Sequence, residues 1–217
     1  MIEKLYKLRS LLTMQETNPL DNYNEPITYF GIAYTLTKED NDRLNSLDAN
    51  IQERLKDVLY LSPYGSRHIT IMNLTSVVDG YEDHDVIQFI ESNVGLYRDR
   101  LRAIASSLDP FEVRLTRLQV GSGAIILRGE DQGQISKIRD ELMDLPRLGG
   151  RIIDSGFIHS TQARYKKRIL VSDVREQLKS VEVDVPITVD RIGIVRADVC
   201  FSRPHTIVEE FDLGSKN

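Results

Sequence analysis

The sequence predicts an α+β fold with two lobes, each built from an antiparallel sheet flanked by helices, and with a central cleft between the lobes. Segments with helical and strand patterns do not alternate strictly along the chain, which favours antiparallel sheets over a doubly wound parallel sheet. The order of expected elements in the first half of the chain is echoed in the second half, and each half contains one His-x-Thr triplet. We therefore expect residues 1–217 to form a single, pseudo-symmetric bilobed domain, with each triplet on a central strand of its own lobe.

The composition is that of an ordinary globular chain. Apolar residues make up 41% and charged residues 28% of the 217 positions, a length that is sufficient for one sizeable core. No apolar run approaches the roughly 20 residues that a membrane-spanning helix needs, and the opening stretch MIEKLYKLRSLL mixes acidic, basic and apolar residues, unlike a secretory signal. The single cysteine, Cys200, excludes an internal disulfide. We therefore expect a cytoplasmic monomer without contact with a membrane.

The charge balance limits the class of partner. The formal net charge of −5 argues against a protein that grips long duplex nucleic acid, because that function requires a strongly basic face. A nucleotide or an RNA end remains compatible with this charge, since a few local cations suffice to hold one or two phosphates.

In the first half of the chain, apolar spacing and turn residues define each expected element. The expected order is a helix over residues 2–17 within an N-terminal helical extension (residues 1–25), a strand over 28–35, a long helix from an N-cap at Thr37 to Leu61, a turn over 62–65, and a strand carrying His68.

The second half begins with a further long helix and a hairpin that alternates apolar and polar residues. The expected order is a helix over residues 83–108, hairpin strands over 111–119 and 124–128, a helix over 131–146, a short buried strand over 152–158 that leads into His159, a basic turn, a helix over 171–178, and several strands from 181 to 212.

The two triplets are His68-Ile69-Thr70 and His159-Ser160-Thr161. Side chains alternate faces along a strand, so each histidine shares a face with its threonine. The pairing places a titratable ring beside a hydroxyl group twice in one domain, and the two sites could meet across the cleft. The alternative is a pair of partly buried histidines that only hydrogen-bond their neighbours.

These residue types suit phosphodiester cleavage without a metal. The reaction needs one group to deprotonate the attacking oxygen and another to protonate the leaving oxygen, and imidazole can perform either step near neutral pH. The charged phosphate oxygens need hydrogen-bond donors, which the threonine hydroxyls can supply. The residues alone leave open which histidine is the base and which is the acid. Neither a metal nor a cofactor is expected.

The extended motifs, HITI at residues 68–71 and HSTQAR at 159–164, are similar to those of the two-histidine (2H) phosphoesterase superfamily, in particular to its 2′-5′ RNA ligase-like cyclic phosphodiesterases. The resemblance implies a bilobed 2H fold and hydrolysis of a 2′,3′-cyclic or 2′-linked phosphodiester of a nucleotide or RNA end, with His159 as base and His68 as acid. The polar Gln162 departs from the family pattern, in which this position is usually apolar. Two alternatives remain, namely a cyclic di- or oligonucleotide signalling molecule as substrate, and a non-catalytic nucleotide- or RNA-binding module.

Four further residues are candidates for substrate binding. Arg164 and Tyr165 open the basic run after the second triplet, where a cation could attract phosphate and the tyrosine could stack on a base. Arg67 precedes the first triplet, and Tyr34 lies on the first expected strand. For Tyr34 a core position is the competing interpretation, and for the basic run it is an exposed turn.

Three other patterns are not interpreted as sites. His205-Thr206 lacks the intervening residue, so it is not a third triplet. The acidic residues over 82–85 are typical of a helix N-terminus rather than of a metal site. The glycines at 121 and 123 fit a hairpin turn rather than a nucleotide-binding loop.

Overall fold

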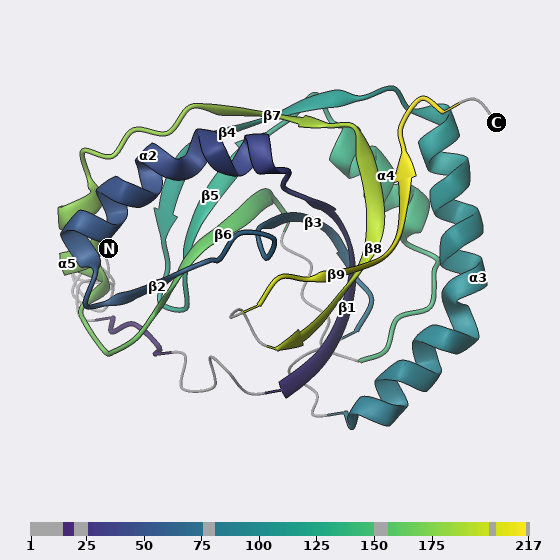
Figure 1. The fold of residues 1–217 in the computed structure, drawn as a ribbon, viewed down its shortest axis with the longest axis horizontal. Helices are drawn as coiled ribbons and strands as arrows, with labels where there is room; N and C mark the ends of the chain where they lie inside the picture. The colour runs from purple at the N-terminus through teal and green to yellow at the C-terminus, as the bar shows by residue number, and fades with distance from the viewer. Residues whose placement is uncertain (1–14, 20–25, 76–80, 150–155, 200–202, 216–217) are drawn as a thin grey trace, which may run out of the picture.

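Two antiparallel sheets form the centre of the computed structural model, which describes residues 15–19, 26–75, 81–149, 156–199 and 203–215 (Figure 1). The four-stranded sheet has the order β3 (His68–Asn73), β1 (Pro26–Thr35), β8 (Arg191–Val199) and β9 (Thr206–Asp212). The five-stranded sheet has the order β2 (Leu59–Leu61), β6 (Ile158–Tyr165), β5 (Ile125–Glu130), β4 (Phe111–Val120) and β7 (Val185–Val189). All pairings between these strands are antiparallel, which confirms the predicted α+β class.

Four helices cover the sheets in the described part of the chain. Two of them, α3 (Asp83–Ser107) and α4 (Gln134–Leu142), pack on the four-stranded sheet, where α3 contacts β1, β8 and β9 and α4 contacts β3. The other two, α2 (Lys38–Leu55) and α5 (Val171–Leu178), contact each other and the strands of the five-stranded sheet. None of these helices is long and apolar enough to cross a membrane.

The helices and strands form where the local sequence favours them. Thr37 caps α2 in a capping box with Asp40, as expected, and leucine and isoleucine side chains at helical spacing bury one face of the helix. In β4, Phe111 and Val113 face the core while Glu112 between them is exposed, which is the period-2 pattern of a strand with one buried face.

The lobes do not correspond to the two halves of the chain. Strand β2 and helix α2 come early in the sequence but belong to the five-stranded sheet, whereas β8 and β9 come late and complete the four-stranded sheet. Strand β3 lies at the edge of its sheet, so the expectation of a central strand for His68 is wrong. His159 does lie on an internal strand, because β6 has neighbours on both sides.

Several expected boundaries need correction. Helix α2 ends at Leu55 rather than at Leu61, because residues 59–61 pair with β6 as strand β2. Helix α4 is shorter than the expected 131–146. Most of the expected strand over 152–158 lies outside the described residues, and β6 begins at Ile158 and continues through Tyr165. The second triplet therefore lies inside a strand, and the first residues of the expected basic turn belong to that strand.

The expected N-terminal helix falls almost entirely outside the described residues. Within the described segment 15–19, Glu16 forms an isolated antiparallel bridge with Leu170 instead of a helical turn. Thr17 adds a backbone hydrogen bond to Ile169, so this segment runs along the connection between β6 and α5.

Candidate active site

The first triplet lies on the edge strand β3. Ile69 and Ile71 are buried in the core, whereas His68 and Thr70 are partly exposed on the opposite face. Pairing with β1 fixes this register, with His68 opposite Thr35. The structure therefore agrees with the expected sharing of a face by His68 and Thr70.

The second triplet repeats the arrangement on β6. Ile158 and Ser160 are buried, and His159 and Thr161 are partly exposed on the other face. In the ladder with β5, His159 lies opposite Arg128. The histidine and the threonine again share one face of a strand.

The two triplets meet because β3 packs against β6 across the junction of the sheets. The ring of His68 is near enough for its charge to contribute to the lowered pKa of His159. The two histidines therefore lie near each other, although they come from different sheets.

Each histidine ring is held by the backbone two residues upstream. Nδ1 of His68 lies 2.8 Å from the carbonyl oxygen of Ser66, and the ring of His159 hydrogen-bonds the backbone of Phe157. A carbonyl oxygen can only accept, so Nδ1 of His68 carries the proton in this contact, and in the neutral ring Nε2 carries the lone pair. The repeated contact fixes both rings in a similar way and leaves Nε2 of His68 available for proton transfer.

Burial and nearby cations keep both rings neutral at physiological pH. Burial is the largest cause that lowers the pKa of His68, and the guanidinium of Arg164 lowers it further. Burial also lowers the pKa of His159 to about 4, with added contributions from His68, Arg139 and Arg164. Because positive charge disfavours imidazolium, a bound anion would reverse this effect and raise both pKa values.

Two arginines supply the positive charge of the site. Arg164 lies on β6, and its Nη1 donates to the carbonyl oxygen of Gly123 at 3.2 Å. Arg139 extends from α4 and donates to the carbonyl oxygens of Ile71 and Thr70 at 2.9 and 3.1 Å. Arg164 was predicted as a substrate-binding residue and lies in the site, although it is half-buried rather than exposed. Arg139 was not predicted, because nothing in its local sequence distinguishes it from any basic residue near the end of a helix.

A third histidine, His205, also belongs to this region. Its ring centroid lies 4.6 Å from that of His68, at an interplanar angle of 50°. Its backbone N–H donates to the carbonyl oxygen of Gly65 at 3.0 Å, which attaches the segment before β9 to the loop before β3. Burial and then the charge of His68 lower the pKa of His205 to about 3. His205-Thr206 is not a third triplet, as predicted, but the sequence pattern gave no indication that His205 packs on His68.

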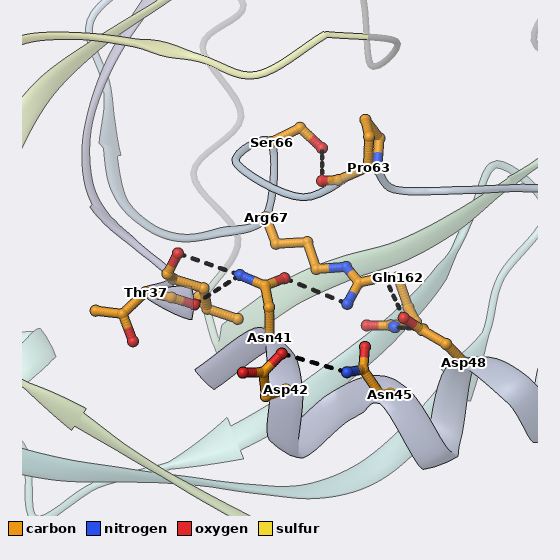
Figure 2. Close-up of polar contacts among 10 residues, drawn as sticks. Thr37, Asn41, Asp42, Asn45, Asp48, Pro63, Ser66, Arg67 and Gln162 are labelled. Carbon is orange, nitrogen blue, oxygen red and sulfur yellow. Dashed lines mark hydrogen bonds and ion pairs between the residues drawn. The ribbon is translucent and has the colours of Figure 1, made fainter. Parts of the chain in front are cut away.

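Three other residues were predicted to contact substrate, but their side chains are buried. Tyr34 is 1% exposed, and its hydroxyl donates to Asp40 at 2.7 Å. Tyr165 is fully buried, and its hydroxyl donates to the carbonyl oxygen of Gly121 at 2.8 Å. Arg67 is 5% exposed and forms an ion pair of 2.5 Å with Asp48 (Figure 2). These three side chains are buried and bonded to other groups of the protein, so they are not exposed for contact with a substrate.

The acidic segment before α3 is a helix start. Helix α3 begins at Asp83, and the exposed His84 contacts the neighbouring Asp85 at 3.2 Å. In the part of the chain that the structure describes, no three His, Cys, Asp or Glu side chains are grouped in a way that could hold a metal ion.

No protein-family model and no curated protein sequence matches the chain. Solved structures do match its fold. TT0787 of Thermus thermophilus has a TM-score of 0.59 at 16% identity, with 87% of this chain and 100% of that chain covered. E. coli LigT complexed with NADP+ has a TM-score of 0.57 at 16% identity, covering 88% of this chain and 100% of LigT. A structure described as a phosphoesterase has a TM-score of 0.50 at 12% identity, with 87% and 100% covered.

These identities are too low to transfer an activity, but the coverage extends over nearly the whole chain. The matched structures include LigT and a structure described as a phosphoesterase. The chain therefore shares its fold with these structures, which agrees with the fold expected from the resemblance to the two-histidine phosphoesterases.

Proposed function

We propose that the chain is a metal-independent phosphodiesterase that hydrolyses a 2′,3′-cyclic or 2′-linked phosphodiester of a nucleotide or RNA end. One observation carries the proposal. The strands that carry the two His-x-Thr motifs pack against each other although they belong to different sheets, and the charge of Arg164 acts on both histidine rings. Two imidazoles beside a fixed cation suit an anionic substrate, because the bound anion favours protonation of one ring, which can then deliver a proton while the neutral ring removes one.

In the proposed reaction, one histidine removes a proton from water as the water oxygen attacks phosphorus. The bond from phosphorus to the 2′ or 3′ oxygen breaks, and the other histidine protonates the leaving oxygen. By the family resemblance we assign the base to His159 and the acid to His68. Thr70 and Thr161 would donate hydrogen bonds to the non-bridging oxygens, and Arg164 would balance their charge. The product is a phosphomonoester, and the two histidines exchange protons with solvent before the next turnover.

Several features support a nucleotide substrate. LigT has been crystallised with NADP+, with ATP and with 3′-AMP, and the ATP and 3′-AMP complexes match this chain with TM-scores of 0.55 each. A net charge of −5 combined with two arginines at the site fits a small anionic ligand better than an extended nucleic acid. The single cysteine fits a cytoplasmic protein, and we expect it to act as a monomer.

The test is a substrate screen of the purified protein in excess EDTA. The panel contains 2′,3′-cyclic nucleotides, 2′-5′ and 3′-5′ dinucleotides, cyclic dinucleotides and ADP-ribose cyclic phosphate, and His68→Ala serves as the inactive control. Hydrolysis of a 2′,3′-cyclic or 2′-linked substrate in EDTA, lost in the control, would support the proposal.

Three outcomes would count against it. Activity that disappears on chelation and returns with zinc or manganese would indicate a metallohydrolase. Hydrolysis confined to cyclic dinucleotides would retain the chemistry but contradict the substrate class. Tight nucleotide binding without turnover would indicate a binding module.

A further inference from the structure

We propose that Asp48 is a positioning residue that sets the spacing between the two His-x-Thr motifs. Its carboxylate accepts a hydrogen bond from Arg67, which precedes His68, and another from Gln162, which follows Thr161 (Figure 2). The catalytic part of this inference rests on the proposed phosphodiesterase function. The structural part concerns only the relative position of the two histidine rings and is tested separately below.

The bridge joins helix α2, the loop before β3 and strand β6, which are distant in the sequence. Nη2 of Arg67 lies 2.5 Å from Oδ2 of Asp48 on α2, and Nε2 of Gln162 on β6 donates to Oδ1 of the same carboxylate. The side chains of Arg67 and Asp48 are 5% and 16% exposed, and Gln162 is fully buried. Each carboxylate oxygen therefore holds one motif, in a place with little competition from water.

A second contact fixes Arg67 from the start of α2. Its Nη1 lies 3.3 Å from Oδ1 of Asn41, and the amide nitrogen of Asn41 donates to the carbonyl oxygens of Leu36 and Thr37 (Figure 2). The guanidinium therefore hydrogen-bonds two side chains, Asn41 and Asp48, which lie two turns apart on the same face of α2. A planar donor fork held at two points has little freedom to rotate.

The bridge matters because no ladder joins β3 to β6. The two strands belong to different sheets, so regular backbone hydrogen bonds fix each motif within its own sheet but not relative to the other. Contacts outside the β3 and β6 ladders therefore set the distance between the motifs. Gln162 also contributes its backbone, since its carbonyl oxygen accepts from the N–H of Ser62 at the start of the loop that leads to Arg67.

The residue types suit this task. A buried ion pair adds little net stability compared with apolar packing, but its directional hydrogen bonds can specify one geometry. Proton transfer to and from a single phosphate requires donor and acceptor positions within a fraction of an ångström, and a displacement of about 1 Å can reduce the rate about 100-fold. The bridge also gives a reason for a polar residue at position 162, where the resemblance suggests an apolar one.

The first test is Gln162→Met, which removes one arm of the bridge without changing charge and with similar side-chain length. The exposed Gln177→Met is the matched control. If a substrate is found, we expect kcat to fall about 10- to 100-fold with KM within a few-fold of the wild type, because binding groups remain while the geometry of proton transfer loosens. Unchanged kcat in a folded Gln162→Met protein would overturn the proposal.

Substitutions of Asp48 test the carboxylate side of the bridge. Asp48→Asn leaves Arg67 without its charge partner and should lower kcat, and Asp48→Glu should restore part of it because the carboxylate is retained. Asp42→Asn, on the exposed face of the same helix, is the control. Equal kcat for the Asn and Glu variants, with equal thermal stability, would contradict a role for the carboxylate.

The last test needs no substrate, so it separates this proposal from the proposed function. NMR titration gives the pKa of His159 with and without His68→Ala, and the difference measures how strongly the two rings interact. We expect this difference to shrink in the Gln162→Met background and to stay unchanged with Gln177→Met. An identical difference in all backgrounds would show that the bridge does not set the distance between the rings.

Discussion

The rings of His68 and His205 pack against each other with their centroids 4.6 Å apart, which places a histidine from the segment before β9 over a candidate catalytic histidine on β3. Burial is the largest cause of the lowered pKa of His68. Removing the neighbouring ring in His205→Ala admits water, so the pKa of His68 should rise toward its usual value of about 6.5. NMR titration of the His68 ring measures this directly. An unchanged pKa of His68 in His205→Ala would show that other groups account for the burial of the His68 ring.

The two triplet histidines should act as one unit. His68→Ala and His159→Ala each remove one proton transfer and should reduce kcat/KM about 10²- to 10⁴-fold. The double variant should be scarcely worse than the poorer single variant, because a reaction lacking one transfer gains little from the other. His84→Ala, at the start of α3, is the control. A folded single variant within a few-fold of the wild type would exclude the two-histidine mechanism.

The pH dependence should differ between kcat/KM and kcat. The active form needs one neutral and one protonated ring, and in the free protein the pKa of His159 is about 4 and that of His68 is also lowered. Above both values the acid is missing, so kcat/KM should fall as pH rises and have its optimum on the acid side of about 6.5, the usual pKa of histidine. A bound phosphodiester anion favours the protonated rings, so the kcat profile should lie at higher pH. The two limbs belong to the coupled pair. A kcat/KM optimum above about pH 7 would contradict the proposed protonation states.

Arg164 should affect both binding and titration. Its guanidinium lowers the pKa of His68 and of His159, and we propose that it balances substrate charge. Arg164→Ala should raise KM about 10-fold or more, since hydrogen bonds to charged groups contribute about 1.5–3 kcal/mol. It should also move the alkaline limb of kcat/KM to higher pH. Lys167→Ala, at an exposed position just past β6, should change neither quantity. Equal effects of the two variants would indicate a general charge effect.

The same lowered pKa values predict acid sensitivity of the fold. An unfolded histidine has a pKa of about 6.5, whereas His159 in the folded protein has a pKa of about 4. Below about pH 6.5 the unfolded chain therefore binds more protons than the folded protein, and the free energy of unfolding should fall as pH decreases from about 6.5 to about 4. Urea denaturation at several pH values measures this slope, and the slope should decrease in His159→Ala. A slope unchanged by that variant would assign the acid sensitivity to other groups.

Local sequence patterns were sufficient for the features that depend on neighbouring residues. The period of a strand determines that His68 and Thr70 share a face, and the capping preference of Thr37 determines where α2 begins. Features that depend on distant contacts were missed. The end of α2 at Leu55 reflects pairing of the next segment with β6, which overrides the continued helical pattern.

The dependence on distant contacts also explains which residues near the candidate site were wrongly predicted or missed. Tyr165 was expected to be exposed because its neighbours are charged, but the position of β6 between β5 and β2 places it in the core. The position of His205 depends on the approach of its segment to the loop at Gly65. No pattern within a few residues of either side chain encodes such an approach.

The order of strands β3-β1-β8-β9 has a consequence for folding of the chain during translation. Strands β8 and β9 follow every other described element in the sequence, yet β8 is the inner neighbour of β1 and the segment before β9 supplies the ring that packs on His68. A nascent chain that has already emerged as far as β7 carries both His-x-Thr motifs but only half of the sheet that holds the first one. The motifs are therefore translated before the sheet that holds the first one is complete, and a chain cut short after β7 would lack both the strand that pairs with the second edge of β1 and the ring that packs on His68.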